Sequence, residues 1–499
     1  MFSEPVISLP SGKTLCKIGL MAGVVALAGW LSRQAGIAPS PLSLVSVCTF
    51  VGVIGTALFF WSHRVAVALL GASVLICLRA VTLHGALRAS EHGIILFLMG
   101  MMIIVGAIKD LGLLTWIIQS VINKKKMSGP IFTLILCGLS ALLASLIDEI
   151  SSIVVVLALV FQVCDTLKIR AAPFVLIAVL CTNIGSAATM LGNPVGIFIG
   201  NKAGFTFGQF LTGAAPVSLL ALAATAAVVT AWYRKDIQAM SQAMEEHRAR
   251  REGLGPLIRI PHRRGLMVLA VTMLVLALHR QIEDALGLSG AENRNVFLVV
   301  TPLIIAGLLM LYRPHRARHY VERDVEWWTL LFFMLLFAIA GSLVEQGVTR
   351  NIADRLLALS KDGPGATVPF VLALSSVGSA FVDNLVFVAA FTPVIQSLTE
   401  RSADYSVLWW ALLFGACFGG NITAVGSTAN LIALGMLERR GHAHIRFLEW
   451  LKIGLLVGLV TGVLAWALLR VLPMPSPAPN PDAPQVAPPL SPQNEHPRR

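Results

Sequence analysis

The 499-residue sequence has little charge and no ordered pattern of cysteines. Asp, Glu, Lys and Arg make up 13% of it, against about 25% in ordinary soluble domains. The seven cysteines are scattered through or beside apolar segments, without the spacing of metal ligands or of a disulfide framework. The sequence also lacks a nucleotide-binding glycine loop and a nucleophile constellation. We therefore predict that the protein is not an enzyme and holds no metal or organic cofactor.

Long hydrophobic runs are what the sequence has instead. Hydrophobic residues make up 56% of the chain, and runs long enough to cross a bilayer recur from about residue 17 to residue 470. The net charge of +12 does not indicate a nucleic-acid partner, because the basic residues gather in short loops beside these runs without alternating aromatic residues. We predict an all-α integral membrane protein that is embedded in the lipid bilayer and binds no nucleic acid.

A register of 235 residues relates two parts of the chain: Glu91 matches Glu326, and Gly112 matches Gly347. Counting crossings between the basic loops places Glu91 outside and Glu326 inside, so the two copies enter the membrane from opposite faces. We predict a polytopic transporter with two inverted-topology repeats in a cell inner membrane. The same count places the N-terminus in the cytoplasm and the C-terminus outside.

The runs and the register divide the chain into six predicted segments. They are three N-terminal transmembrane helices at 1–90 (near 17–33, 42–61 and 64–82), a first repeat at 91–232, a basic cytoplasmic loop at 233–264, two linking helices and a basic loop at 265–325, a second repeat at 326–471, and a disordered Pro-rich tail at 472–499.

Each repeat carries a polar pair inside an apolar run that is too short for two full spans. Asp148-Glu149 lies within about 129–163, and Asp383-Asn384 lies within about 366–400. Two half-length arms that meet at the pair fit these lengths, so we predict a re-entrant helical hairpin in each copy. Charged groups at membrane depth are costly and by default mark a functional site. Asp before an apolar run is also a good helix N-cap, and this alternative stays open for both aspartates.

Each hairpin is followed by a span that small and polar residues interrupt, at 173–200 and 408–438. Glycines let the backbone unwind there, and freed carbonyls, hydroxyls and amides can bind a small cation. The predicted substrate- and ion-binding residues are the polar groups of the tips and interruptions: Asp148, Glu149, Asn183, Thr189, Asn193, Asp383, Asn384, Asn421, Thr423, Ser427 and Asn430. Half-helix N-termini can face an anion instead, and the asparagines can equally serve as helix-packing contacts.

Three strings carry a resemblance to known transporters: TNIGSAATMLGNP, SAFVDNLVFVAAFTPV and GACFGGNITAVGSTAN. In this order they resemble the ion transporter superfamily, which includes arsenite permeases, the P protein, D-type sodium/proton antiporters and divalent anion:sodium symporters. The resemblance covers roughly residues 91–470 and is closest in pattern to the arsenite permease and P-protein members. It implies a secondary transporter that works by alternating access, and it makes a homodimer the oligomeric state to test.

One departure from the superfamily bears on the substrate. The dicarboxylate symporters carry Ser-Asn-Thr at the hairpin tip, where this chain has Asp148-Glu149-Ile150. Carboxylates there repel a dicarboxylate, while burial and a like-charged neighbour favour proton exchange. We predict proton-coupled efflux of an inorganic cation such as Na⁺, or of a metalloid oxyacid such as arsenite, with H⁺ or Na⁺ as the coupling ion. The alternatives are sodium-coupled symport of an anion (dicarboxylate or sulfate) and, from another class, a passive channel or a non-transporting membrane scaffold.

Two smaller expectations concern charged residues outside these motifs. Glu91 and Glu326 lie at predicted span ends, where exposure at the membrane interface is the simpler account. Lys109 and Asp110 are neighbours and are expected to form a local pair near the membrane surface.

Overall fold

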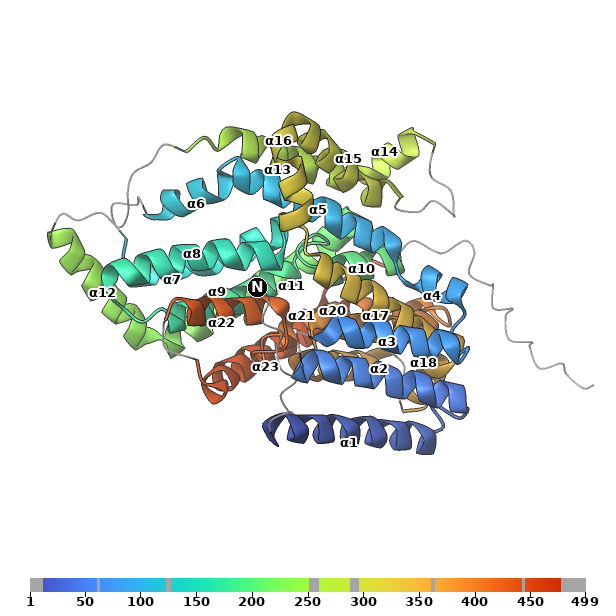
Figure 1. Ribbon diagram of the computed structural model, residues 1–499. Helices are drawn as coiled ribbons and strands as arrows, with labels where there is room; N and C mark the ends of the chain where they lie inside the picture. Colours follow the sequence, from blue (N-terminus) through green and yellow to red (C-terminus); the bar gives the residue numbers. More distant parts are fainter. Residues whose placement is uncertain are drawn as a thin grey trace, which may run out of the picture.

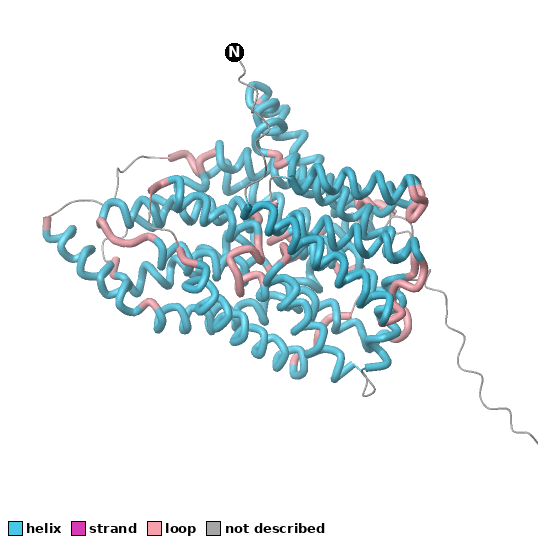
Figure 2. Tube along the Cα trace, turned by 60° about the horizontal axis from the view of Figure 1, so that its bottom comes forward, coloured by secondary structure: helices cyan, strands magenta, loops and turns pink. Residues whose placement is uncertain are grey.

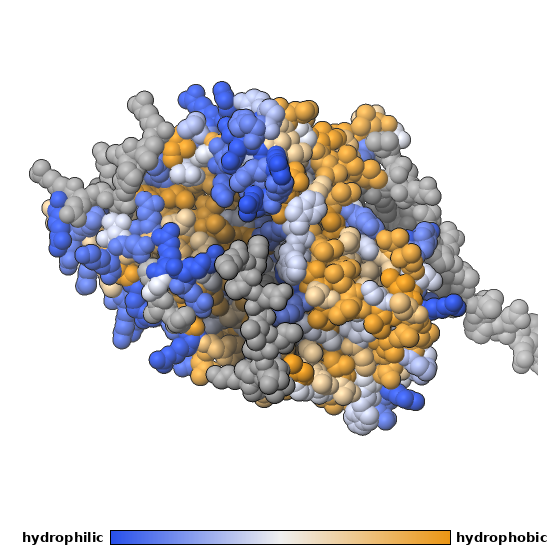
Figure 3. All heavy atoms as spheres, in the orientation of Figure 1, coloured by the Kyte–Doolittle hydropathy of each residue, from blue (hydrophilic) through white to orange (hydrophobic). Residues whose placement is uncertain are grey.

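The computed structural model describes residues 12–60, 63–122, 127–250, 260–287, 296–359, 364–441 and 445–476, and all regular elements in these ranges are helical (Figure 1). Seven of the described helices are long and apolar enough to cross a membrane, or eight if one bent pair counts as a span. Hydrophobic side chains form a broad patch on the face shown in Figure 3, while hydrophilic ones gather near the top of this view, where Figure 1 labels α16 (Pro314–His319). The fold is therefore that of an all-α integral membrane protein.

The N-terminal part consists of α1 (Gly12–Gln34), α2 (Pro41–Phe59), α3 (Arg64–Cys77) and the short α4 (Leu83–Ala89). The third predicted span was expected to reach residue 82, but α3 ends at Cys77. Arg79 adopts the left-handed conformation with φ 59°, which cannot continue a right-handed helix. The segment after α3 therefore turns back as α4 instead of lengthening the span.

The two copies have the same order of helices. The first contains α5 (His92–Asp110), α6 (Leu113–Ile122), α7 (Gly129–Leu146), α8 (Glu149–Leu167), α9 (Ala172–Ser186), α10 (Pro194–Ala203) and α11 (Phe207–Trp232). The second contains α17 (Trp327–Glu345), α18 (Val348–Leu359), α19 (Pro364–Phe381), α20 (Asn384–Thr399), η4 (Ala403–Ser406), α21 (Val407–Gly419), α22 (Thr428–Arg439) and α23 (Phe447–Val471). The first five helices of each copy start 235 residues apart, at 92, 113, 129, 149 and 172 against 327, 348, 364, 384 and 407. The register read from the sequence therefore extends through the whole of each hairpin.

The hairpins α7–α8 and α19–α20 enter the bundle from opposite ends. The open end of the first lies beside the end of α22, where Arg440 contacts Asp165 at 3.3 Å. The open end of the second lies beside the end of α10, since Gln396 and Lys202 line one cavity. Helices α9 and α10 together run from the end of the bundle beside Arg440 to the end beside Lys202. The hairpin tips and the helix breaks therefore lie between these two ends of the bundle. Figure 2 shows loop segments in the middle of the bundle, where these breaks fall.

The connecting segment is more structured than the sequence indicates. It contains α12 (Arg234–Ala249), α13 (Arg263–Ala277), α14 (His279–Ala285), α15 (Val296–Tyr312), α16 (Pro314–His319) and the π-helix η3 (Tyr320–Asp324), and α13 and α14 meet at a 59° bend. The prediction of a simple solvated loop at 233–264 is wrong for its first half, because Ile237, Met240 and Met244 of α12 are buried. These three residues recur at helical spacing and form one apolar stripe on a charged helix.

The linking helices are exchanged between the copies. Helix α3, which precedes the first copy, packs against α17 of the second, whereas α15, which precedes the second copy, packs against α5 of the first. The second contact is close, since a Cβ atom added to Gly100 would lie 2.8 Å from a backbone carbon of Pro302. Each copy is therefore completed by a helix that belongs, in sequence, to the other half.

The first residues of the Pro-rich tail depart from the predicted disorder. The carbonyl of Pro475 accepts a hydrogen bond from Nε1 of Trp410 at 3.0 Å, and that of Ser476 accepts one from Nε2 of Gln209 at 3.2 Å. The buried indole of Trp410 needs such an acceptor, which fixes the chain up to residue 476. Residues 477–499 of the predicted tail, and the three lysines at 124–126, lie outside the described residues.

Candidate functional site

All the predicted site residues lie at the two hairpin tips or at the two helix breaks. Ten of them are buried, and Asp148 is half-buried. No three His, Cys, Asp or Glu side chains in the described part of the chain are placed to hold one metal ion. A cation bound here would therefore depend on one or two carboxylates together with hydroxyl and amide oxygens.

The first hairpin tip contains one capping carboxylate and one that makes no cap. Asp148 precedes α8, and its Oδ1 accepts a hydrogen bond from the backbone N–H of Ser151 at 2.7 Å, so the N-cap alternative is confirmed. Glu149 is only 2% exposed, and its Oε2 has no hydrogen-bond partner within the described residues. A buried carboxyl oxygen without a partner is costly, which makes Glu149 the stronger candidate for a binding role.

The second tip repeats the cap with different chemistry beside it. Asp383 caps α20 by accepting from the N–H of Leu385 at 3.1 Å, and it also accepts from the Thr428 hydroxyl of α22 at 2.7 Å. Asn384 stands where the first copy has Glu149, and its Oδ1 accepts from the same N–H at 2.8 Å. The two tips therefore differ by one carboxyl group, and the extra one belongs to the first copy.

Three asparagines join the two helix breaks. Nδ2 of Asn183 in α9 donates to Oδ1 of Asn421 and to Oδ1 of Asn430, both at 2.9 Å. Asn430 in turn donates to the carbonyls of Gly420 and Thr423 at 2.9 Å each. The amides thus fix the breaks to each other, which supports their role as packing contacts. Oδ1 of Asn183 has no partner in the described structure and remains a candidate ligand atom.

Asn193 and Ser427 begin the second halves of the broken spans. Oδ1 of Asn193 accepts from the N–H of Gly196 at 2.8 Å, and the Ser427 hydroxyl accepts from the N–H of Ala429 at 3.2 Å. Nδ2 of Asn193 also donates to Ser186 Oγ at 2.9 Å and to Cys417 Sγ at 3.1 Å. Both residues therefore act as N-caps, and Asn193 also links the first break to α21.

The two threonines hold the breaks against the hairpin tips in the same way in both copies. The Thr189 hydroxyl donates to the carbonyl of Ser145 at the end of α7, and the Thr423 hydroxyl donates to that of Ala380 at the end of α19. Both hydroxyls also accept a backbone N–H two residues later, at 3.2 Å. Because these groups already donate and accept, the structure favours a positioning role over ion binding for both threonines.

Two glycines allow the broken helices to approach the hairpins. A Cβ atom added to Gly185 would lie 2.2 Å from the Cα of Ala141, and one added to Gly419 would lie 2.4 Å from the Cα of Ser376. Real Cβ atoms do not come this close to a backbone atom. The glycines that break the spans in the sequence are thus also the points of backbone contact with α7 and α19.

The carboxyl groups of both copies meet around Glu149. Its side chain interacts electrostatically with Asp148 and Asp383, and it lies beside Ser186 and Asn384. Further buried oxygens on α8 and α9, Ser152 Oγ and Thr182 Oγ1, lack hydrogen-bond partners within the ranges described. A cation, a proton or a neutral hydroxylated solute could use this set of acceptors.

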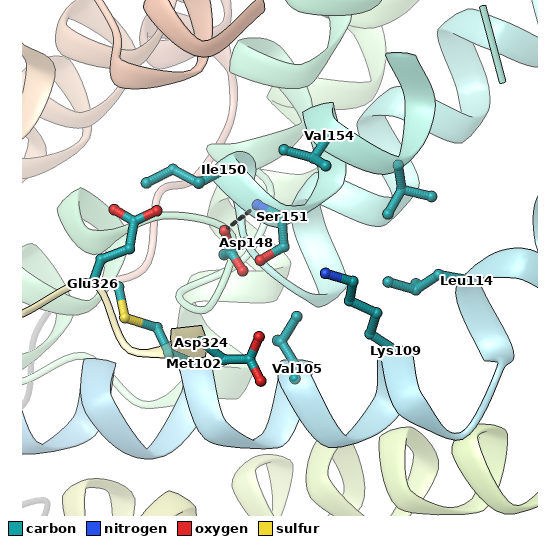
Figure 4. Close-up of a pocket in the computed structure, with 12 residues that line it drawn as sticks. Met102, Val105, Lys109, Leu114, Asp148, Ile150, Ser151, Val154, Asp324 and Glu326 are labelled. Carbon is teal, nitrogen blue, oxygen red and sulfur yellow. Dashed lines mark hydrogen bonds between the residues drawn. The ribbon is translucent and has the colours of Figure 1, made fainter. Parts of the chain in front are cut away.

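A cavity of about 160 Å³ leads to the first tip from the second half of α5 (Figure 4). Asp148, Asp324 and Glu326 line it together with Lys109. In Figure 4 Asp148 reaches the cavity from just before α8, and Glu326 from just before α17. Asp324 comes from η3, and Lys109 comes from α5. Glu326 is half-buried, and its side chain lines the cavity beside Asp148. Its position at the membrane interface stays a prediction.

The predicted pairing of Lys109 with Asp110 is wrong. Asp110 accepts two hydrogen bonds from the Arg316 guanidinium, at 2.7 and 2.9 Å. Adjacent helical residues point about 100° apart, so Lys109 faces the cavity while Asp110 faces α16. The cavity therefore has a cation at its mouth that the sequence did not indicate.

A second cavity, of about 460 Å³, lies at the other end of α5 and α17. It is lined by Glu91, Lys202, Phe198, Glu345 and Thr392, among others. Glu91 forms an ion pair with Lys202 of α10, which the interfacial account of this residue did not include. The two cavities lie toward opposite ends of the bundle, with the hairpin tips between them.

Several residues of the site were not predicted from sequence: Ser186, Thr428, Lys109, Asp324, and Arg64 at the start of α3, which lines a small cavity with Asp383. The first two lie inside the quoted motifs, and their hydroxyl side chains were a usable signal. The other three stand at helix ends or in a basic loop, where charged residues are common, so only the fold reveals their position.

The sequence also matches a known protein family and several known relatives. A profile of the citrate transporter family matches residues 50–415. The chain belongs to the citrate transporter family. It is 31% identical to an uncharacterized transporter of Mycobacterium tuberculosis, over 83% of this chain and 95% of that protein. It is also 25% identical to the P protein of Mus musculus, over 83% of this chain and 58% of that protein.

A solved structure agrees at the level of the fold. The YdaH transporter of Alcanivorax borkumensis has a TM-score of 0.50 at 16% identity, over 78% of this chain and 87% of that chain. The predicted resemblance to the ion transporter superfamily is confirmed by the family match and by the P protein among the relatives. The protein is therefore a member of a family of membrane transporters.

Proposed function

We propose that the protein is a proton-coupled secondary transporter that exports a small inorganic cation or a metalloid oxyacid by alternating access. The observation that carries this proposal is Glu149, a buried carboxyl group between the two hairpin tips with one oxygen that lacks a hydrogen-bond partner among the described residues. A group in this position can exchange a proton for a cation, because both compete for the same oxygen.

The two cavities support alternating access. One reaches Asp148 from one end of the bundle, and the other ends near the second hairpin from the opposite end. We infer that the smaller cavity faces the cytoplasm, since α16 and its arginines lie beside it. With this orientation the N-terminus would lie inside and the C-terminus outside, as expected for inverted repeats. We propose a cell inner membrane as the location.

An anion symporter is the second candidate, and the family name favours it. A citrate-like or dicarboxylate solute would face the N-termini of α8, α10, α20 and α22, which converge at the tips and breaks. Asp148, Glu149 and Asp383 oppose this candidate, because their negative charges repel a carboxylate solute. The anion would need these groups protonated or covered by cations.

The test is a flux assay on purified protein in liposomes with a preset pH gradient. Na⁺, Li⁺, K⁺, arsenite, succinate and citrate are added in turn, with wild type beside Glu149→Gln. We expect one cation or arsenite to dissipate the gradient, and Glu149→Gln to reduce the initial rate at least about tenfold. Glu245→Gln, an exposed position on α12, is the matched control and should behave as wild type.

The other outcomes separate the alternatives. Sodium-dependent uptake of succinate or citrate that Glu149→Gln leaves intact would replace the proposal by the anion symporter. Dissipation without any added solute, equal in both proteins, would indicate a passive channel. A wild-type protein that gives no flux with any of these solutes would leave the scaffold as the better account.

A further inference from the structure

Arg64 is a buried cation that belongs to neither repeat. It begins α3 and is 3% exposed. Its Nη2 donates to the Thr329 hydroxyl of α17 at 2.9 Å, and its guanidinium stacks over the Phe332 ring at 5.1 Å from the centroid. An arginine so deeply enclosed requires a compensating negative charge.

The compensating carboxylates come from the second copy. Arg64 interacts electrostatically with Asp383 and with Glu326. Arg64 and Asp383 also line the same small cavity, of about 20 Å³, together with Phe332 and Val425. Glu326 is joined to the arginine through Thr329, whose hydroxyl contacts Oε2 of Glu326 at 3.1 Å. The guanidinium thus lies at the depth of the second hairpin tip.

Helix α3 gives no local reason for an arginine at this position. The N-terminal end of a helix is the positive end of its dipole and disfavours a cation, and the first turn of α3 contains no acidic residue. Helix α2, which packs against α3, has no charged residue between Pro41 and Phe59. Among the described contacts of Arg64, the favourable ones are with α17 and with the tip of α20.

The first copy has no equivalent of this arginine. At the register of 235 residues Arg64 corresponds to Val299 on α15, the helix that packs on α5 as α3 packs on α17. Lys109 lines the cavity beside Asp148, but this residue is exposed, so water screens its charge. Of the two tips, only the second has a buried counter-charge in the described structure.

We propose that Arg64 is a fixed counter-charge, a positioning residue that neutralises Asp383 and leaves Glu149 as the one buried carboxyl group of the two tips that can exchange a proton. This inference rests on the proposed function and refines it, because the site then carries a single proton or monovalent cation in each cycle. Asp383 acts through its pairing with Arg64 and its cap on α20, and it does not itself exchange a proton.

Charge-pair neutralisation tests the proposal. Arg64→Gln, Asp383→Asn and the double variant are reconstituted, and proton flux is measured with the solute that wild type transports. Each single variant leaves one buried member of the pair without the other and should lower the initial rate at least about tenfold. The double variant removes both charges and should return to within about threefold of wild type, and Arg64→Lys should retain more activity than Arg64→Gln.

Thermal unfolding in detergent provides a readout that does not need transport. The single variants should unfold at a lower temperature than wild type, and the double variant should regain most of the loss. Arg33→Gln, at an exposed position near the end of α1, is the control and should change neither measurement. A double variant no better than the worse single variant, in both flux and unfolding, would overturn the pairing. If wild type transports no tested solute, the proposed function fails while the unfolding pattern still decides whether Arg64 and Asp383 compensate each other.

Discussion

Lys202, near the end of α10, forms an ion pair with Glu91, the residue that precedes α5. Both residues line the larger cavity, and Phe198, one helical turn before Lys202, stacks on Phe337 of α17 with 5.0 Å between ring centroids. The second half of the first broken span is therefore attached to one copy by an ion pair and to the other by an aromatic pair. Movement of α10 during transport has to separate both contacts.

Breaking the ion pair should make the larger cavity more accessible. The reporter is a cysteine at Thr392, a residue that lines the cavity and is 1% exposed. It is introduced into a protein in which the exposed Cys16 and Cys77 are replaced by Ser. Because a partly exposed ion pair contributes at most about 1 kcal/mol, Glu91→Gln should speed maleimide labelling of this cysteine by about two- to fivefold. Arg318→Gln, which removes the exposed pair with Glu322, should not change labelling. Equal labelling rates in the Glu91→Gln variant and in the protein that retains Glu91 would show that the Glu91–Lys202 ion pair does not restrain α10.

Replacing Glu149 by Gln should stabilise the protein while it reduces transport. Glu149 is buried close to Asp148 and Asp383, and a buried charge without full compensation costs free energy. Removal of this charge should raise the free energy of unfolding by about 1 to 3 kcal/mol at pH 8, which thermal unfolding in detergent can detect. Lower stability than that of the Glu245→Gln control would mean that the carboxyl group makes favourable contacts that its amide cannot.

The glycines at the hairpin contacts should tolerate no side chain in either copy. A methyl group at Gly185 or Gly419 would collide with the backbone of α7 or α19, and overpacking of this kind costs at least about 1 to 3 kcal/mol. Gly185→Ala and Gly419→Ala should both lower the unfolding temperature and the yield of folded protein. Gly138→Ala, on the open side of α7 with nothing within 4 Å, should gain up to about 1 kcal/mol from helix propensity. Sensitivity in only one copy would contradict the equivalence of the two contacts.

Thr189 and Thr423 should matter for stability in equal measure. Thr→Val at either position removes the donor to the carbonyl at the end of the preceding hairpin arm, and a buried carbonyl that loses its partner costs about 1 to 3 kcal/mol. Thr212→Val, exposed on α11, should have little effect on unfolding. A variant that keeps wild-type stability but changes the apparent affinity for the transported ion would instead assign that threonine to ion binding.

The sequence predicted the elements that depend on local chemistry and length. The apolar runs around Asp148 and Asp383 are too short for two spans, and the structure has hairpins over 129–167 and 364–399. The glycine-rich interruptions coincide with the breaks between α9 and α10 and between α21 and α22. Duplication made these predictions firmer, because each feature appears twice, at a spacing of 235 residues for the hairpin helices and 234 for the starts of α10 and α22.

Long-range electrostatic contacts could not be predicted in the same way. Arg64 and Asp383 are separated by more than three hundred residues in the sequence, and nothing local in α3 indicates a carboxylate partner. The stripe Ile237, Met240 and Met244 was visible at helical spacing but lay in a charged segment, where a solvated loop is the usual interpretation. Asp110 has a lysine neighbour and still pairs with Arg316, because helix geometry, not sequence distance, decides which side chains meet.

The exchange of α3 and α15 between the copies also affects how the protein is made. Helix α5 ends at Asp110, and α15, which covers it, begins at Val296. At about 5 to 20 residues per second, a ribosome needs roughly 10 to 40 seconds to make the chain between them. During that time the small-residue face of α5 around Gly100 has no partner from its own half. The insertion machinery or the lipid must cover this face of α5 until α15 has been synthesised and inserted. Neither half of the chain should therefore assemble correctly when it is expressed alone.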